Sequence, residues 1–205
     1  MRSLSKIPRA ALLAASILLS GAQAADQPKP LDEGRLDPAW FGPGIEFRTT
    51  SSIDYVWAKQ GFSCKGMALR IEAWPEPVFT GKERRGRDAA QAFQLAEEMP
   101  MRLRNGLRQA LQGNSEVVSD AGDMIVSGRL VDYVAKGTMG TSQPQATWDM
   151  KITDAQTGEL LVALHHRRLS SVSTVAERID MWIEEFGKAL REDLVIASKG
   201  KPAKN

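Results

Sequence analysis

Residues 147–164 read TWDMKITDAQTGELLVAL and predict a β-hairpin, around which the rest of the fold can be arranged. Three apolar residues alternate with polar ones in the first half, as on a strand with one buried face: Trp148, Met150 and Ile152. The sequence DAQTGE at residues 154–159 is a turn signal, because Asp154 can cap a turn and Gly158 takes positive φ without steric cost. Leu160–Ser170 is therefore expected to return as the partner strand.

An amphipathic helix is predicted after the hairpin. Thr174 and Glu177 have the spacing of a capping box, in which each side chain binds the other residue's free backbone amide at a helix start. Apolar residues then recur every three, four or seven positions, which places them on one helix face: Ile179, Trp182, Ile183, Phe186, Leu190 and Leu194. That face requires a sheet or another helix to cover it.

A longer helix is predicted over residues 87–112. Its apolar stripe consists of Phe93, Ala96, Leu103, Leu107, Ala110 and Leu111. Gly113 suits the left-handed position that follows the last turn of a helix. Pro100 lacks a backbone donor, so we expect a bend there or a division into two shorter helices.

Alternating patterns indicate further strands at residues 53–58, 67–73 and 123–136. In the first, Ile53, Tyr55 and Trp57 are expected to share one face, and in the last, Ile125, Val131 and Tyr133. The element order is strand, strand, helix, several strands, helix. It predicts an α+β fold in which a mainly antiparallel or mixed sheet carries two amphipathic helices on one face.

The first 24 residues have the three parts of an export signal: a positive head, an apolar middle of ten residues and a small-x-small cleavage site. The residues of the predicted cleavage site are Ala22, Ala24 and Ala25. The apolar middle is about half as long as a membrane-spanning helix, so no stable membrane span is expected. We predict a periplasmic or secreted protein; the alternative is an uncleaved helix at the membrane interface.

Cleavage would change the net charge. The whole chain has 27 Lys and Arg against 25 Asp and Glu, for a charge of +2. The signal holds three of the basic residues and none of the acidic ones, so the remaining chain carries −1. This balance argues against capture of nucleic acid by the surface as a whole.

Composition suggests one folded domain between two polar ends. Residues 25–50 are rich in Pro, Asp, Glu and Gly, and we expect an extended lead-in. Residues 198–205 are polar and are expected to form a disordered tail. Residues 51–197 then form a single α+β domain, long enough to bury one core.

The chain has one cysteine and two histidines. Cys64 has no partner for an internal disulfide, and it lies too far from the predicted mature amino terminus to carry a lipid anchor there. Burial is the expected state of this thiol; a reactive thiol and a disulfide with another chain are the alternatives. His165 and His166 are neighbours on a strand and should point to opposite faces, so no metal or acid-base role is predicted.

No motif predicts catalysis or cofactor binding. Ser127-Gly128 follows Val126 rather than a glycine, so the nucleophile elbow G-x-S-x-G is missing. We therefore assign no catalytic, cofactor-binding or metal-binding residue. The competing hypothesis is a periplasmic enzyme, or a small-ligand or metal-binding protein, whose site combines dispersed residues such as Cys64, His165, Asp132 and Arg167.

Two features are candidate partner contacts. The first is the basic run KERRGR at residues 82–87, which contains Arg84, Arg85 and Arg87 and could contact anionic lipid or wall polymer. A solvated loop before a helix is the simpler interpretation. The second is Trp40, which either folds back onto the domain or offers an aromatic anchor to a partner.

The strand VSGRLVDY at residues 126–133, the Gly-rich gap after it and the turn DAQTGELL at residues 154–161 resemble a family of uncharacterised bacterial envelope proteins, mostly lipoproteins. Their domain is related to the TolB amino-terminal domain, the curli-secretion lipoprotein and the penicillin-binding-protein activators. The resemblance covers about residues 51–197. It implies an α+β fold and a non-catalytic binding or assembly role, and no site residue carries over.

These observations predict an exported periplasmic protein that serves as a non-catalytic interaction or assembly module of the bacterial cell envelope. No cofactor and no nucleic acid are expected. The partner would be another envelope protein or a cell-wall component, reached through a sheet edge or the loops.

Overall fold

The computed structural model of the protein describes residues 31–50, 52–80, 83–135, 143–169, 174–192 and 194, together with the backbone of 201–202. The predicted export signal with Ala22, Ala24 and Ala25, the Gly-rich gap and most of the predicted tail lie outside the described residues.

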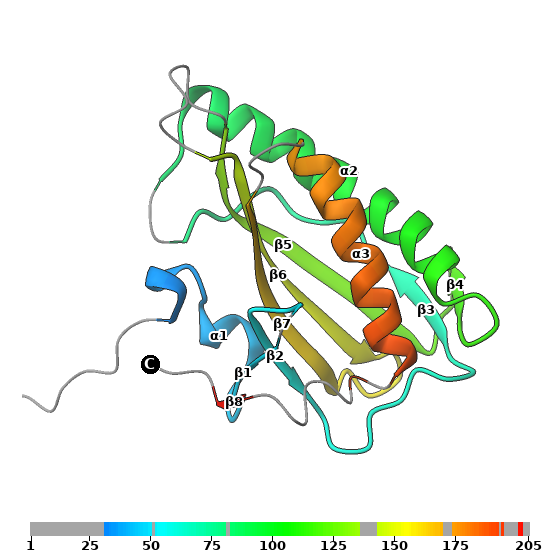
Figure 1. Ribbon diagram of the computed structural model, residues 1–205. Coiled ribbons are helices and arrows are strands. Elements are labelled where there is room, and N and C mark those ends of the chain that lie inside the picture. Colours follow the sequence, from blue (N-terminus) through cyan, green and yellow to red (C-terminus); the bar gives the residue numbers. More distant parts are fainter. Residues whose placement is uncertain are drawn as a thin grey trace, which may run out of the picture.

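Eight strands form one mixed sheet in the order β4-β3-β5-β6-β7-β2-β1-β8 (Figure 1). Their bounds are β1 Arg48–Thr49, β2 Tyr55–Ala58, β3 Ala68–Ile71, β4 Glu116–Val118, β5 Met124–Val134, β6 Gln145–Asp154, β7 Leu160–Leu169 and β8 Lys201–Pro202. Strand β3 is parallel to β4 and β5, and the other neighbouring strands are antiparallel. The predicted α+β class is confirmed.

The predicted hairpin forms the centre of the sheet as β6 and β7. Its turn forms for the expected reason: Asp154 Oδ1 accepts hydrogen bonds from the backbone amides of Gln156 and Thr157, at 3.0 and 2.7 Å. Gly158 has a φ of +71°, the left-handed conformation that glycine adopts without steric cost. The turn signal in the sequence therefore acts locally, through one carboxylate and one glycine.

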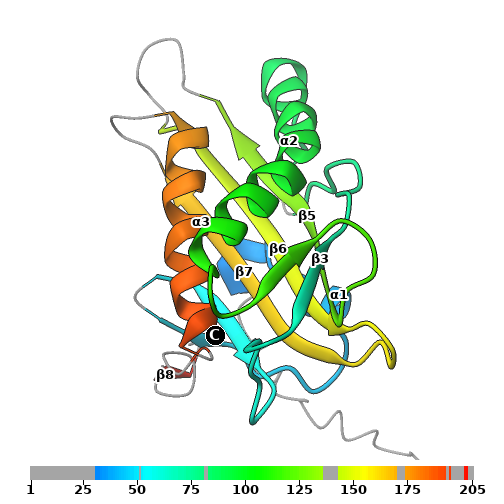
Figure 2. The ribbon, with the colours of Figure 1, turned by 90° about the vertical axis from the view of Figure 1, so that its right-hand side faces the viewer.

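Two long helices, α2 (Gly86–Ala110) and α3 (Val175–Arg191), pack side by side on one face of the sheet (Figures 1 and 2). The predicted capping box is present at the start of α3, where Thr174 Oγ1 accepts from Glu177 N at 3.1 Å and Glu177 Oε2 accepts from Thr174 N at 3.0 Å. All six residues of the predicted apolar stripe of α3 are buried.

Helix α2 departs from its prediction at one residue. It continues through Pro100 as one helix, so of the two predicted outcomes the division is excluded. Phe93, expected on the buried stripe, is 41% exposed. The stripe that faces the sheet is instead filled by Ala92, Leu95 and Met99, which continue the spacing of the buried leucines farther along the helix.

The two helices run in the same direction and approach closely through glycine. A Cβ atom on Gly187 of α3 would lie 2.4 Å from the Cβ of Ala110 in α2. A Cβ atom on Gly106 of α2 would lie 2.5 Å from Cγ2 and 3.3 Å from Cβ of the buried Ile183. Small residues at the contact thus set the helix separation.

We expect Gly187→Ala to lower the free energy of unfolding by about 1–2 kcal/mol, because overpacking against Ala110 outweighs the better helix propensity of alanine. Gly106→Ala should have a similar effect, because the buried, β-branched Ile183 rarely changes χ1 in a helix. Met181→Ala, exposed on the same helix as Gly187, is the control and should change stability by less than about 0.5 kcal/mol. Denaturant unfolding of the three variants measures the differences, and unchanged stability in both glycine variants would show that the close approach of the helices is not limiting.

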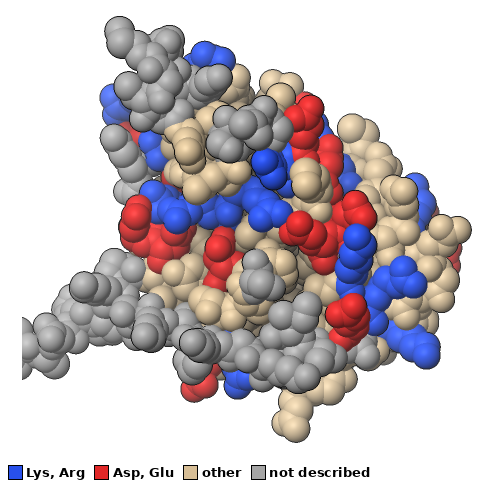
Figure 3. Space-filling model, in the orientation of Figure 1, with Lys and Arg blue, Asp and Glu red and all other residues tan. Residues whose placement is uncertain are grey.

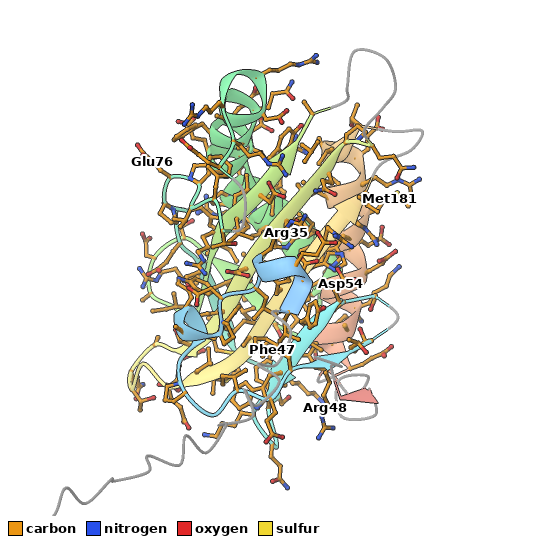
Figure 4. All side chains as sticks on the ribbon, turned by 90° about the vertical axis from the view of Figure 1, so that its left-hand side faces the viewer. Arg35, Phe47, Arg48, Asp54, Glu76 and Met181 are labelled. Carbon is orange, nitrogen blue, oxygen red and sulfur yellow. The ribbon has the colours of Figure 1, made fainter. Side chains whose placement is uncertain are left out.

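Both faces of the sheet are covered, whereas the sequence pattern of β2 predicted one buried face. Val56 faces the helices in the main hydrophobic core, and Tyr55 and Trp57 face a second, smaller cluster on the opposite, outer face. Residues 31–44, which we call the strap, cover this outer face with a 3₁₀ turn, η1 (Leu31–Gly34), and a short helix, α1 (Pro38–Phe41) (Figure 4).

The expectation of an extended lead-in over residues 25–50 is therefore wrong for its described part. Leu36, Phe41 and Phe47 are each at most 6% exposed and pack on Ala163 of β7. The prolines and acidic residues that suggested an extended chain serve local turns, because Asp37 Oδ1 caps α1 by accepting from Ala39 N at 3.0 Å. Burial of three apolar side chains offsets the entropy of ordering the segment.

Candidate functional site

A β-bulge places Asp132 on the outer face of the sheet. Leu130 pairs with Trp148 and Asp132 pairs with Thr147, so Val131 is the extra residue between them. Tyr133, beyond the bulge, packs toward the helices, while Ile125 lies before it. The expectation that Ile125, Val131 and Tyr133 share one face is thus wrong, because an extra residue reverses the alternation of faces.

Asp132 joins the strap to the segment before α2. Its Oδ1 accepts from Arg84 Nε at 2.6 Å, and its Oδ2 accepts from Arg84 Nη2 and from Arg35 Nε, both at 2.9 Å. Burial alone would raise the pKa of Asp132, but the hydrogen bonds from Arg84 and Arg35 outweigh it and hold the pKa below the usual range. Asp132 is therefore an ionised structural anchor.

His165 lies between two carboxylates on the same outer face. Its Nδ1 is 2.6 Å from Asp149 Oδ1 in β6, and its Nε2 is 3.0 Å from Asp32 Oδ2 in the strap. Arg129 of β5 donates to the other oxygen of Asp149 at 2.8 Å. Burial alone would lower the pKa of His165, but the hydrogen bonds to Asp149 and Asp32 outweigh burial and raise it.

The dispersed-site hypothesis combined four residues, and the structure brings three of them into one charged network. Arg167 Nη1 lies 3.4 Å from Asp32 Oδ1, which connects it to His165. Asp132 joins through Arg35, whose Nη1 lies 3.6 Å from the same Asp32 oxygen. Every one of these charged groups faces an opposite charge.

Cys64 lies away from this network. It is fully buried in the main core, as expected, and its thiol donates to Leu190 O at 3.3 Å. The hydroxyl of Ser115 lies 3.4 Å from the sulfur. The buried interpretation of the thiol is confirmed, and a site that combines Cys64 with His165 is wrong, because the sheet separates them.

His166 points to the helix side, opposite to His165, as predicted. Its ring stacks on Trp182 at 5.2 Å between centroids and lies edge-on to Trp148 at the same distance. Burial is the main cause that lowers the pKa of His166, although its Nδ1 lies 2.9 Å from Asp54 Oδ2. This histidine belongs to the aromatic core that joins α3 to the hairpin.

The candidate partner contacts divide into buried and exposed residues. Arg84 is not part of a solvated loop, because its side chain is only 15% exposed and binds Asp132. Arg85 and Arg87 are exposed, and Arg85 pairs with Glu83 at 2.9 Å. Trp40 folds back onto the domain, with its ring under Lys151 and Arg129 at 4.0 and 4.6 Å.

A groove of about 780 Å³ lies on the outer side of the two helices. Its floor contains Gly106, Ala110 and Ile183, and its rim carries Met101 and Met181, which are 57% and 50% exposed. The charged residues of its rim are Arg102, Asp180, Glu184, Lys188 and Arg191. Acidic and basic side chains lie next to one another along the surface that carries α3 (Figure 3). The sequence did not predict this groove, since it depends on how the helices pair.

Within the described ranges, we find no group of three His, Cys, Asp or Glu side chains that could hold a metal ion. The helices described here are also too short or too polar to cross a membrane.

No family model matches the chain, and no curated protein matches it in sequence. Solved structures with a similar arrangement include the PelC dodecamer from Paraburkholderia phytofirmans, with a TM-score of 0.47 and 12% identity, covering 66% of this chain and 96% of that one. Protein XCC0632 from Xanthomonas campestris, of family DUF330, has a TM-score of 0.39 and 12% identity, covering 76% of this chain and 97% of that one. A minor lipoprotein from Acinetobacter baumannii has a TM-score of 0.32 and 14% identity, covering 66% and 97%. We carry over no residue role from them.

Proposed function

We propose that this chain is an exported, non-catalytic interaction module of the bacterial cell envelope, and that it binds an amphipathic helix of a partner protein in the groove between α2 and α3. The observation that carries the proposal is the contrast between the two faces of the sheet. On the face of the sheet that the strap covers, the ionisable side chains form ion pairs with one another. On the opposite side of the molecule, the open groove between the helices presents two exposed methionines.

The geometry of the groove suits a helix. Two parallel helices form its walls, and their close approach at Gly106 and Ala110 forms its floor. Methionine side chains are flexible and polarisable, so Met101 and Met181 can adapt to the apolar face of a helix. The charged rim, in which Arg102 pairs with Asp180 and Lys188 with Glu184, would interact with the polar flanks of the guest.

The alternative function is an enzyme or a small-ligand or metal-binding protein that uses Asp132, His165 and Arg167. These three residues share one network, which is the observation in its favour. However, His165 is fully buried and both of its ring nitrogens face carboxylates, so the ring has no free nitrogen for a substrate. A small molecule or metal bound stoichiometrically to purified protein would reverse this ranking.

Site-specific photocrosslinking in the native cells tests the groove. A photoreactive residue is introduced at Met181 in the full-length chain, and at Phe93 as the control, since Phe93 is similarly exposed on α2 but does not line the groove. We expect one discrete adduct from position 181 whose crosslinked peptide, mapped by mass spectrometry, is an amphipathic helix of another envelope protein. The control position should give none.

A charge variant completes the test. Met101→Lys combined with Met181→Lys should reduce the yield of that adduct, read from a photoreactive residue at Gln109, by about tenfold or more. The stability of the protein should change little, because both side chains are on the surface. Absence of an adduct, equal adducts from both positions, or an adduct to a second copy of the chain would each overturn the proposal.

A further inference from the structure

The strap is held to the sheet by more than apolar contact. Three of its charged residues bind partners on two strands, β7 and β5: Asp32 binds His165 and Arg167, Arg35 binds Asp132, and Asp37 lies 3.5 Å from Arg129. Figure 4 shows Arg35 over the outer face of the sheet. The strap carries three acids and one base, and the sheet beneath it supplies the opposite charges.

One of these contacts differs from the others in its chemistry. Arginine stays charged at every pH that a folded protein tolerates, whereas an imidazole gains and loses a proton near neutrality. His165 is the group of this kind beneath the strap, and its Nε2 faces a strap carboxylate directly. The contact between His165 and Asp32 therefore depends on one proton.

We propose that the strap is a proton-controlled latch, in which His165 holds Asp32 while both ring nitrogens carry protons, and in which loss of the Nε2 proton loosens the strap from the outer face of the sheet. This inference concerns the opposite face of the sheet from the groove and does not rest on the proposed function.

The geometry indicates which nitrogen keeps its proton. Asp149 is fully buried, is fixed by Arg129 and lies 2.6 Å from Nδ1, the shorter of the two contacts. A neutral imidazole with its single proton on Nδ1 preserves that bond. The Nε2 lone pair would then face the oxygen of Asp32 across 3.0 Å, where two acceptors repel each other.

The arginines packed beside the contact between His165 and Asp32 supply no proton switch. Arg167 and Arg35 lie on the far side of Asp32 and remain charged, and Tyr55 of β2 contributes a ring edge-on to the imidazole at 5.7 Å. Lys151, over the ring of Trp40, has a pKa lowered chiefly by burial and next by the charge of Arg129. Loss of the Lys151 proton would also loosen the strap, through the contact with Trp40. The Asp32→Asn variant distinguishes the two residues, because it removes the partner of His165 and leaves Lys151 unchanged.

The sign of the pH dependence follows from linkage. Burial lowers the pKa of His165 and Asp149 raises it, and the hydrogen bond and charge of Asp32 raise it further, so this contact of the closed strap favours uptake of a proton. The contribution of His165 to closure is fully present below the pKa of the uncovered imidazole. It declines as the pH rises from there and is lost above the pKa of the covered one.

Hydrogen exchange measured by mass spectrometry on the full-length chain tests the latch, with the unfolded chain at each pH correcting for intrinsic exchange rates. The opening of residues 31–44 should increase by up to about tenfold per pH unit between the two imidazole pKa values, which nuclear magnetic resonance of His165 measures. Peptides from β6 and α3 should keep their protection throughout.

Two strap variants with the same change of charge provide the matched comparison. Asp32→Asn should abolish the pH dependence of strap opening and lower the measured pKa of His165. The carboxylate of Glu33 is 73% exposed and binds Arg35 but not His165, so Glu33→Gln should leave the pH dependence and the pKa of His165 unchanged. Neither variant touches the main core, so both are expected to fold. A strap whose protection does not change with pH in the unmodified chain, or equal effects of the two variants, would overturn the proposal.

Discussion

Trp182→Ala is expected to lower the free energy of unfolding by about 3–5 kcal/mol. The indole is fully buried at the junction of helix and sheet. It stacks on Phe186 at 5.2 Å and on His166 at the same distance, and lies edge-on to Trp148 at 4.8 Å. Truncation would remove all three contacts and leave a cavity between α3 and the hairpin.

Denaturant unfolding monitored by far-ultraviolet circular dichroism measures this loss. The matched control is Met181→Ala, one residue earlier on the same helix, whose side chain is 50% exposed. That variant should change stability by less than about 0.5 kcal/mol. A similar cost for both would show that α3 is stabilised by helix propensity and not by its packing on the sheet.

Asp132→Asn is expected to cost about 3 kcal/mol, because it leaves two largely buried guanidinium groups facing a neutral amide. The side chain of Asp132 is 2% exposed, and those of Arg35 and Arg84 are each 15% exposed. The control is Glu83→Gln, which breaks a fully surface pair with Arg85 and should cost at most about 0.5 kcal/mol.

The same variant makes a pH prediction. The native pKa of Asp132 is lowered, so its contribution to stability is present above the ordinary pKa of aspartate and is lost as the pH falls through the native value. Stability measured in acid should therefore converge for the unmodified protein and Asp132→Asn. A constant difference down to pH 2 would mean that Asp132 acts by shape and not by charge.

The elements that sequence patterns predicted correctly are those that local interactions determine. The capping box at Thr174 and Glu177, the turn at Asp154 and the apolar stripe of α3 each depend on residues within a few positions of one another. Such signals are read directly from spacing. The burial of Cys64 was predicted correctly for a different reason, since a free thiol behaves as a small apolar group.

The prediction of an extended chain at the strap was wrong because the same composition is typical of two different structures. Prolines and acids favour an extended chain, yet they also favour short turns when a surface is available to receive them. Leu36 and Phe41 are too few to indicate a folded segment by themselves. Their burial depends on Ala163 and on the ion pairs of Asp32, which come from the distant end of the chain.

The sequence by itself determined the α+β class, the hairpin and the fact that His165 and His166 face opposite sides, because alternation along a strand is local. Which histidine faces which side was decided by the tertiary structure. Thr153 pairs with Leu160, but Ile152 pairs with Val162, so Leu161 is an extra residue that reverses the alternation. Strict alternation from Leu160 would have placed His166 toward the strap.

The bulge at Val131 likewise reverses the alternation of faces along β5 and turns Asp132 toward the strap. Together the two bulges bring Asp132 and His165 to the same face of the sheet. A bulge forms where packing on both faces of a sheet favours an extra residue, and that packing involves segments far apart in the chain. The charged residues of the latch were visible in the sequence. Their meeting under the strap depended on a change of register by one residue in each of two strands.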